Sequence, residues 1–149
     1  MNIHDVIRLH SGQPLPHQLL SGYLKKYKRP NDKIKALKDK GMLETIKKGL
    51  YIAGSAVGGV KPDPFVLANH LWGPSHISKE SALSYYGLIP ERVYGTTSVT
   101  IKPSRTFDTP AGNFTYTHLE LPYYAFGIKS ANISGDSWAL IACPEKALC

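Results

Sequence analysis

The residues of this sequence whose types and spacing could do chemistry are cationic, and they gather in its first third. Eleven of the 18 lysines and arginines fall within residues 1–54, together with only four of the 11 acidic residues. The whole excess charge of +7 therefore lies in this segment. Segregated positive charge is typical of a domain that binds a polyanion, with nucleic acid as the first candidate and an anionic membrane surface as the second.

Three helices are predicted to position most of these cations. The recurrence of apolar residues every three or four positions predicts helices over 2–10, 15–26 and 31–41. Pro30 separates the second helix from the third, because proline disfavours helical backbone in the residue before it. Asn31 is a suitable N-cap for the third helix, and Gly41 is a suitable left-handed stop.

A hairpin is predicted to follow the third helix. The short strands 43–46 and 50–53 flank a three-residue turn, Lys47-Lys48-Gly49. The order helix, helix, turn, helix, hairpin is that of a winged helix-turn-helix. The sequence therefore predicts a DNA-binding domain of this type over residues 1–54, with double-stranded DNA as its partner. Duplex DNA is favoured over RNA because few aromatic residues are interleaved with the charges.

The geometry of such a domain assigns contacts to individual side chains. Its third helix lies in the major groove, with the early residues facing the base edges. Since Ile34 and Leu37 define the buried side, the expected base-contacting residues are Asn31, Asp32, Lys35 and Ala36. The cations expected beside phosphates are Lys25, Lys26, Lys28, Arg29 and Lys33, with Lys47 and Lys48 at the tip of the wing. Two roles compete at Asn31, and we expect its side chain to cap the helix rather than bond adenine.

The remainder of the chain is predicted to form a small mixed α+β domain over residues 61–149. The small residues of segment 54–60 favour a linker before it. Helices are expected to begin at Asp63-Pro64, at Ser78 and at Cys143-Pro144. Alternating or apolar runs predict strands at 97–101, 114–117, 124–128 and 138–142. The fold class expected for the whole chain is α+β.

The sequence carries no motif that would indicate catalysis. It contains no phosphate-binding loop, no zinc-protease or serine-hydrolase motif and no pair of cysteines at metal-binding spacing. His70 and His76 flank Trp72-Gly73-Pro74, which is not an established ligand spacing. We therefore expect a protein that is not an enzyme and that holds no metal or cofactor. With no apolar run of membrane-spanning length and no signal peptide, we also expect a cytoplasmic protein without a membrane partner.

Three segments resemble those of a known family. Residues 37–43 (LKDKGML) and 46–51 (IKKGLY) are similar to the signature that ends the N-terminal winged helix of the AbiEi family. Residues 77–88 (ISKESALSYYGL) and 143–148 (CPEKAL) are similar to two later helices of that family. The resemblance implies an autoregulating transcriptional repressor and antitoxin of a type IV toxin–antitoxin (abortive infection) system. It implies binding to inverted repeats in the protein's own promoter, and a nucleotidyltransferase-like toxin as functional partner.

The sequence departs from the family in two places. Family members continue past the last of these helices, whereas this chain ends at Cys149, so we expect the second domain to be incomplete. Cys143 replaces a capping threonine. Two other hypotheses remain open at this point. One is a protein-interaction module that contacts a toxin or partner protein without regulating DNA, and the other is a nucleic-acid enzyme or an accessory of a nucleotidyltransferase.

Overall fold

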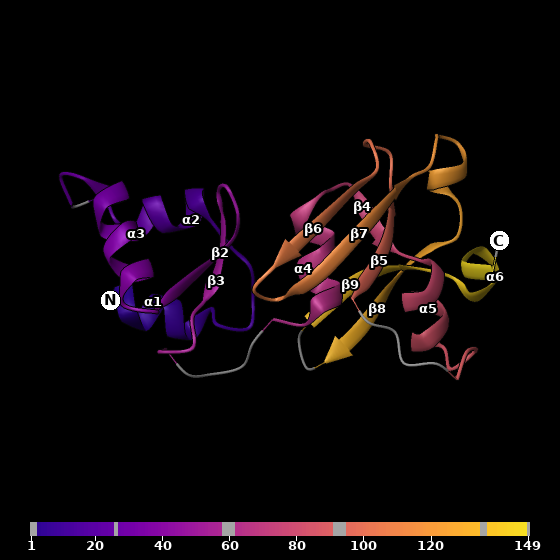
Figure 1. Cartoon of the computed structure of the whole chain (residues 1–149), viewed down its shortest axis with the longest axis horizontal. Helices are drawn as coiled ribbons and strands as arrows, with labels where there is room; N and C mark the ends of the chain where they lie inside the picture. The colour runs from indigo at the N-terminus through magenta and orange to yellow at the C-terminus, as the bar shows by residue number, and fades with distance from the viewer. Residues whose placement is uncertain (1–2, 26, 58–61, 91–94, 135–136, 149) are drawn as a thin grey trace. The chain divides into compact units, whose positions relative to one another are not determined.

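The chain folds into two compact units, Met1–Pro62 and Asp63–Cys149 (Figure 1). The structure is a computed structural model that describes residues 3–25, 27–57, 62–90, 95–134 and 137–148. Over these residues it contains six α-helices and two β-sheets, which confirms the mixed α+β class. Within the same residues, no helix is both long and apolar enough to span a bilayer.

The N-terminal unit packs three helices and a small sheet around one apolar core. Its elements in order are α1 (Ile3–Leu9), β1 (Leu15–Pro16), α2 (His17–Tyr23), α3 (Pro30–Asp39), β2 (Leu43–Lys47) and β3 (Leu50–Ala53). The strands are antiparallel in the order β1-β3-β2. One apolar stripe from each helix fills the core, with Val6, Ile7, Leu20, Leu24, Ile34 and Leu37 almost inaccessible to solvent.

The predicted second helix is wrong at its beginning. Leu15 and Pro16 are extended and pair with Tyr51 and Leu50 of β3, so α2 begins only at His17. Helical periodicity did not reveal this, because a buried leucine suits a strand as well as a helix. Proline is tolerated there because β1 is an edge strand, where a missing N–H donor costs little.

The third helix ends as expected, but it begins one residue early. Pro30 is its first residue and Arg29 its N-cap, without a side-chain capping bond. The cap predicted at Asn31 is therefore wrong, since Asn31 already lies inside the first turn. At the other end Gly41 has φ +75°. The N–H of Met42 donates to the carbonyl of Leu37 at 3.0 Å, which closes the helix as a left-handed glycine allows.

The hairpin turn is tighter than predicted. Lys47 pairs with Leu50 and belongs to β2, so only Lys48 and Gly49 form the turn, with Gly49 at φ +85°. A bulge at Ile46 shifts the register between Thr45 and Lys47. The bulge accounts for the difference, because it inserts one residue before the turn and changes which residues stand opposite each other.

The segment predicted as a linker begins inside the N-terminal unit. Gly54 donates its N–H to the carbonyl of Met42 at 2.8 Å, and Ala56 donates to the carbonyl of Gly41 at 3.1 Å. Val57 is buried in the core of this unit. Residues 54–57 are therefore part of its fold, and the rest of the predicted linker, 58–60, lies outside the described residues.

The C-terminal unit is built on a six-stranded sheet of order β6-β7-β5-β4-β9-β8 (Figure 1). Its elements in order are α4 (Pro64–Leu71), β4 (Ser75–Ile77), α5 (Lys79–Tyr85), β5 (Thr96–Thr100), β6 (Arg105–Thr109), β7 (Gly112–His118), the 3-10 helix η1 (Tyr123–Ala125), β8 (Ile128–Ser134), β9 (Ser137–Ala142) and α6 (Pro144–Leu148). Most pairs are antiparallel, but β4 runs parallel to β9 and β5 parallel to β7.

The two faces of this sheet are covered differently. Tyr116 of β7 and Ser75 of β4 both donate hydroxyl bonds to the carbonyl of Ala68, which places α4 on their face. Thr97 lies on the opposite face, because side chains alternate along a strand. There its hydroxyl donates to the carbonyl of Ser78 at 2.6 Å and fastens the beginning of α5.

Some predictions for this unit were correct and others were not. Asp63 caps α4 by accepting the N–H of Phe65 at 2.9 Å, and helices follow Ser78 and Cys143 as expected. Ser78 occupies the N-cap position without a side-chain capping bond. The strand predicted at 124–128 is wrong, because Tyr123–Ala125 form a 3-10 turn and β8 begins at Ile128. The short strands β4 and β6 were missed, since neither shows a strong alternation of its own.

Candidate nucleic-acid interface

A groove of about 840 Å³ opens on the N-terminal unit between α3, the beginning of α2 and the hairpin. Its walls come from three segments distant in sequence. Helix α3 contributes Asn31, Ile34, Lys35 and Lys38. The end of β1 and the beginning of α2 contribute Pro16, His17 and Gln18, and the hairpin contributes Lys48, Gly49 and Tyr51. The groove is therefore a product of tertiary packing and not of any one helix.

Helical spacing sets the wall that α3 provides. Asn31, Lys35 and Lys38 are separated by four and three residues, so they project from one side of the helix. Ile34 lies beside them at the margin, while it and Leu37 anchor the other side in the core. The two lysine side chains and Asn31 are exposed to solvent. Packing of the apolar stripe thus decides which polar side chains of α3 face the groove.

The hairpin wall is fastened to α2. The N–H of His17 donates to the carbonyl of Gly49 at 2.8 Å. The rings of His17 and Tyr51 lie 6.4 Å apart between centroids. These contacts hold the turn that carries Lys48 against the first turn of α2. Lys48 therefore faces the groove from the side opposite to the lysines of α3.

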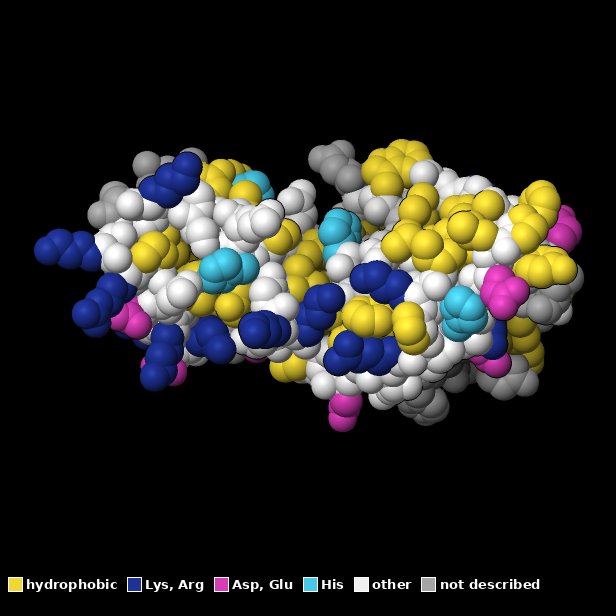
Figure 2. Space-filling view, turned by 90° about the horizontal axis from the view of Figure 1, so that it is seen from above, with side chains coloured by type: hydrophobic (Ala, Val, Ile, Leu, Met, Phe, Trp, Pro, Cys, Tyr) yellow, Lys and Arg dark blue, Asp and Glu magenta, His cyan; other side chains and the backbone are white. Residues whose placement is uncertain are grey.

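The electrostatics of the groove are positive. Among the described residues, its lining includes Lys35, Lys38 and Lys48 but no aspartate or glutamate. Lys and Arg side chains also border the N-terminal unit on the face shown in Figure 2. A concave surface lined by one sign of charge concentrates counterions and raises the rate at which an oppositely charged partner arrives.

Three of the predicted contact residues meet in this groove, and the others do not line it. Those in the groove are Asn31, Lys35 and Lys48. The residues that are exposed elsewhere on the unit are Lys25, Lys28, Arg29 and Asp32, and those that are half-buried are Lys33, Ala36 and Lys47. Lys26 lies outside the described residues.

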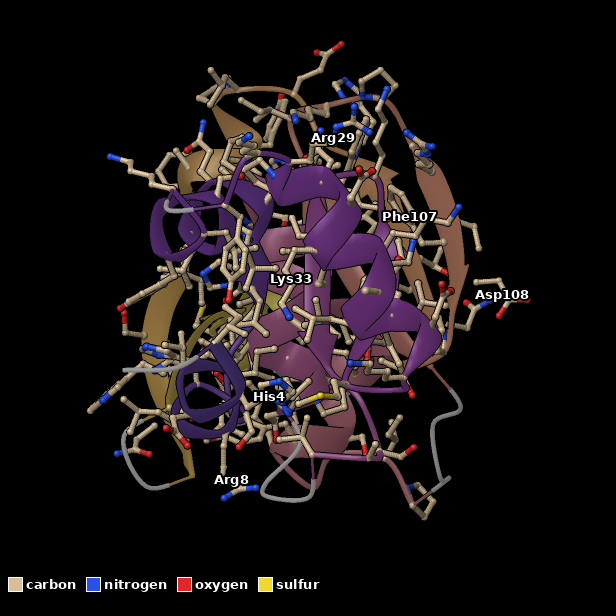
Figure 3. All side chains as sticks on the ribbon, turned by 90° about the vertical axis from the view of Figure 1, so that its left-hand side faces the viewer. His4, Arg8, Arg29, Lys33, Phe107 and Asp108 are labelled. Carbon is tan, nitrogen blue, oxygen red and sulfur yellow. The ribbon has the colours of Figure 1, made fainter. Side chains whose placement is uncertain are left out.

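Arg29 and Lys33 have contacts of their own at the beginning of α3, where Figure 3 labels them. The guanidinium of Arg29 lies 3.7 Å from a carboxylate oxygen of Asp32 in an exposed pair. Exposed pairs of this kind contribute little to stability. The ammonium of Lys33 lies 5.4 Å from the centre of the Tyr27 ring. These residues form a second cationic edge, distinct from the groove.

Among the groove residues that sequence reasoning missed are the polar side chains of Lys38, His17 and Gln18. Lys38 was not among the predicted contact residues, but it is exposed and lines the wall beside Lys35. His17 and Gln18 carried no signal of their own. The second helix was predicted to begin at residue 15, and this prediction did not indicate that the hairpin lies beside them. Pro16 gave no clear clue either, because it occupies the N-cap of α2 and not the first helical position that proline favours.

No protein-family model matches the chain, and no curated protein matches it significantly. The resemblance to the AbiEi family therefore stays a prediction from segments 37–51, 77–88 and 143–148. Within the described residues, no group of three or more histidine, cysteine or acidic side chains could hold a metal ion.

Proposed function

We propose that the N-terminal unit is a winged helix-turn-helix that binds double-stranded DNA. The order α1-β1-α2-α3-β2-β3 supports this proposal, as does the short loop between α2 and α3. In this proposal α3 enters the major groove, and the hairpin that carries Lys48 acts as the wing.

The observation that carries the proposal is the convergence of lysines from two elements on one groove. Lys35 and Lys38 approach from α3 and Lys48 from the hairpin, with Asn31 beside them. Lysines so arranged can neutralise phosphates, which supplies affinity without sequence preference. Asn31 is free of the capping role, so its amide is available to bond the edge of an adenine bidentately.

Binding to DNA is tested by fluorescence anisotropy with a labelled duplex from the region upstream of the gene. The variant Lys35→Gln with Lys38→Gln removes two charges from the groove and is expected to weaken binding about tenfold or more at moderate salt. Lys25→Gln with Lys40→Gln is the matched control, because it also removes two exposed lysine charges and neither residue lines the groove. Far-ultraviolet circular dichroism verifies that all variants fold. Equal losses in the two variants would place the contact elsewhere.

The wider role that we propose is that of an autoregulating transcriptional repressor and antitoxin of a type IV toxin–antitoxin system. It is supported by the similarity of segments 37–51, 77–88 and 143–148 to the AbiEi family. In that role the protein acts in the cytoplasm, binds inverted repeats in its own promoter and counteracts a nucleotidyltransferase-like toxin. The test is to express the neighbouring gene alone and together with this chain. Growth arrest that this chain relieves supports the role, and arrest without relief contradicts it.

A further inference from the structure

The C-terminal unit contains a second concave site, a cavity of about 590 Å³ on the sheet face opposite α4. Its floor is formed by Val99 of β5 and Thr117 of β7, which stand opposite each other in the parallel pair. The beginnings of α5 and α6 and the turn around η1 form the walls. Cavities of about 300–1,000 Å³ are the usual size of small-molecule sites.

Apolar and aromatic side chains form one part of the lining, namely Val99, Leu119, Tyr123, Phe126 and Ala147. Tyr123 and Phe126 line the cavity, yet they remain 64% and 67% exposed. Hydrophobic side chains also gather on the face of the C-terminal unit shown in Figure 2. Two large rings left in solvent beside Val99 offer surface that an apolar ligand could bury, with the hydrophobic effect as driving force.

The wall at Gly127 depends on the absence of a side chain. Gly127 has φ +65°, and a Cβ there would lie 2.9 Å from Sγ of Cys143 and 3.1 Å from Cβ of Lys146. The carbonyl of Gly127 accepts the N–H of Cys143 at 2.6 Å. Glycine thus lets the turn after η1 close against the beginning of α6. The cavity is therefore shaped by a specific close approach and not by loose packing.

One cation of the cavity lining is held in a strained backbone conformation. Lys79 lines the cavity and has φ +56°. Among the described residues, all the others with positive φ are glycines. This conformation costs free energy in a residue with a side chain, and such outliers concentrate at functional sites. The Lys79 side chain is exposed, and no carboxylate pairs with it in the described parts of the chain.

The other ionisable groups of the lining have partners of their own. Nδ1 of His118 lies 3.1 Å from the carbonyl oxygen of Lys102. The ammonium of Lys146 donates to the carbonyl of Tyr124 at 2.6 Å. A hydrogen bond from its own backbone, then one involving Cys143, lowers the pKa of Glu145, so this carboxylate is ionised at neutral pH. The positive charge of Lys129, a residue outside the lining, also lowers the pKa of Glu145. Lys79 is left as the cation that can bind an incoming anion.

We propose that this cavity binds a small organic anion, an amphipathic carboxylate or sulfonate, with its apolar body over Val99 and Thr117 and its acid group at Lys79. The apolar walls accept the body, and the ammonium forms a charge-assisted hydrogen bond with the acid group. The proposal concerns the C-terminal unit alone and does not depend on DNA binding by the other unit.

The test uses the full chain and anilinonaphthalene sulfonate, a fluorescent probe with an apolar ring system and one anionic group. Saturable binding of the probe is expected, with displacement by decanoate at much lower concentration than by decanol. Lys79→Asn removes the charge while suiting the left-handed backbone, because asparagine adopts that conformation readily. We expect this substitution to weaken the binding of the sulfonate probe and of decanoate roughly tenfold and to leave the binding of decanol unchanged. Phe126→Ser is expected to weaken the binding of all three ligands.

Arg105→Gln is the matched control, since Arg105 is an exposed cation of the same unit that does not line the cavity. This variant should bind the probe as the unchanged protein does. The proposal is overturned if the probe does not bind saturably, if decanol competes as well as decanoate, or if Lys79→Asn and Arg105→Gln have equal effects. Binding to the Lys79→Asn and Phe126→Ser variants with unchanged affinity would overturn it as well.

Discussion

The imidazole ring of His76 packs against the phenol ring of Tyr124, with 4.9 Å between the ring centroids. His76 is fully buried in β4, and neither of its ring nitrogens has a hydrogen-bond partner among the described residues. Burial, and then the positive charge of Lys146, lowers the pKa of His76 from 6.5 to about 4. The folded C-terminal unit therefore holds this side chain neutral over a pH range in which the unfolded chain protonates it.

A pH-dependent stability follows from this histidine. Between pH 6.5 and about 4 the unfolded chain binds a proton at His76 that the folded chain does not bind. The free energy of unfolding should fall as the pH is lowered through this range, by roughly 3 kcal/mol in total, and this contribution is fully present above pH 6.5. Urea unfolding followed by tryptophan fluorescence measures it, because Trp72 and Trp138 both lie in the C-terminal unit.

The substitution His76→Phe should remove this dependence. Phenylalanine keeps a ring against Tyr124 and cannot be protonated, so the free energy of unfolding should change less between pH 7 and pH 4.5 than in the unchanged protein. Stability at pH 7 should be equal or higher, because two buried nitrogens without partners are removed. His118→Asn, at an exposed histidine, is the control and should retain the dependence. Equal pH profiles for His76→Phe and the unchanged protein would refute the assignment.

Two glycines of the N-terminal unit should respond to alanine in opposite directions. A Cβ on Gly54 would overlap the carbonyl oxygen of Gly41 and lie 2.7 Å from its carbonyl carbon. Because both atoms are backbone, Gly54→Ala should lower the free energy of unfolding by about 2 kcal/mol or more. Gly22 lies in α2, where an added Cβ would meet nothing within 4 Å outside the helix's own backbone. Gly22→Ala should therefore raise stability by about 0.5–1 kcal/mol.

Far-ultraviolet circular dichroism during urea unfolding measures this pair of variants. The transition of the helix-rich N-terminal unit should move to lower urea for Gly54→Ala and to higher urea for Gly22→Ala. Destabilisation of the same size in both variants would show that the close approach of Gly54 to Gly41 is not the cause of the lower stability of Gly54→Ala.

The salt dependence of DNA binding should report the groove lysines one by one. If Lys35, Lys38 and Lys48 each neutralise a phosphate, each change to glutamine should reduce the slope of log K against log salt by about 0.9. Anisotropy titrations at several salt concentrations give the slope. An unchanged slope in the triple variant would show that these lysines do not contact phosphates, whatever the affinity at a single salt concentration.

Asn31 should affect sequence preference more than affinity for DNA in general. Because its side chain does not cap α3, Asn31→Ala should leave the helix content and the urea midpoint nearly unchanged. Loss of a bidentate contact with adenine should reduce the preference for operator over unrelated duplex by about 1–3 kcal/mol. Competition titrations with the two duplexes measure the preference. A uniform loss on both duplexes would instead assign Asn31 to the phosphate backbone.

Several features of the fold could be predicted from the sequence because they arise from short-range interactions. The apolar spacing of Ile34 and Leu37 predicted α3, and Gly41 predicted its end. Asp63 before Pro64 predicted the beginning of α4. Each of these signals acts within about one helical turn, which is the range over which backbone capping and helical periodicity operate. The gathering of charge in residues 1–54 is likewise a property of composition.

Only the tertiary structure decided which of these side chains share a site. Lys38 and Lys48, ten residues apart on a helix and a hairpin, face one groove because β3 pairs with β1 and the N–H of His17 bonds to Gly49. Val99, Lys79 and Phe126 meet around one cavity because strand order and a close approach at Gly127 bring their segments together. Strand register and packing between distant segments depend on many weak contacts at once, and no short stretch of sequence encodes them.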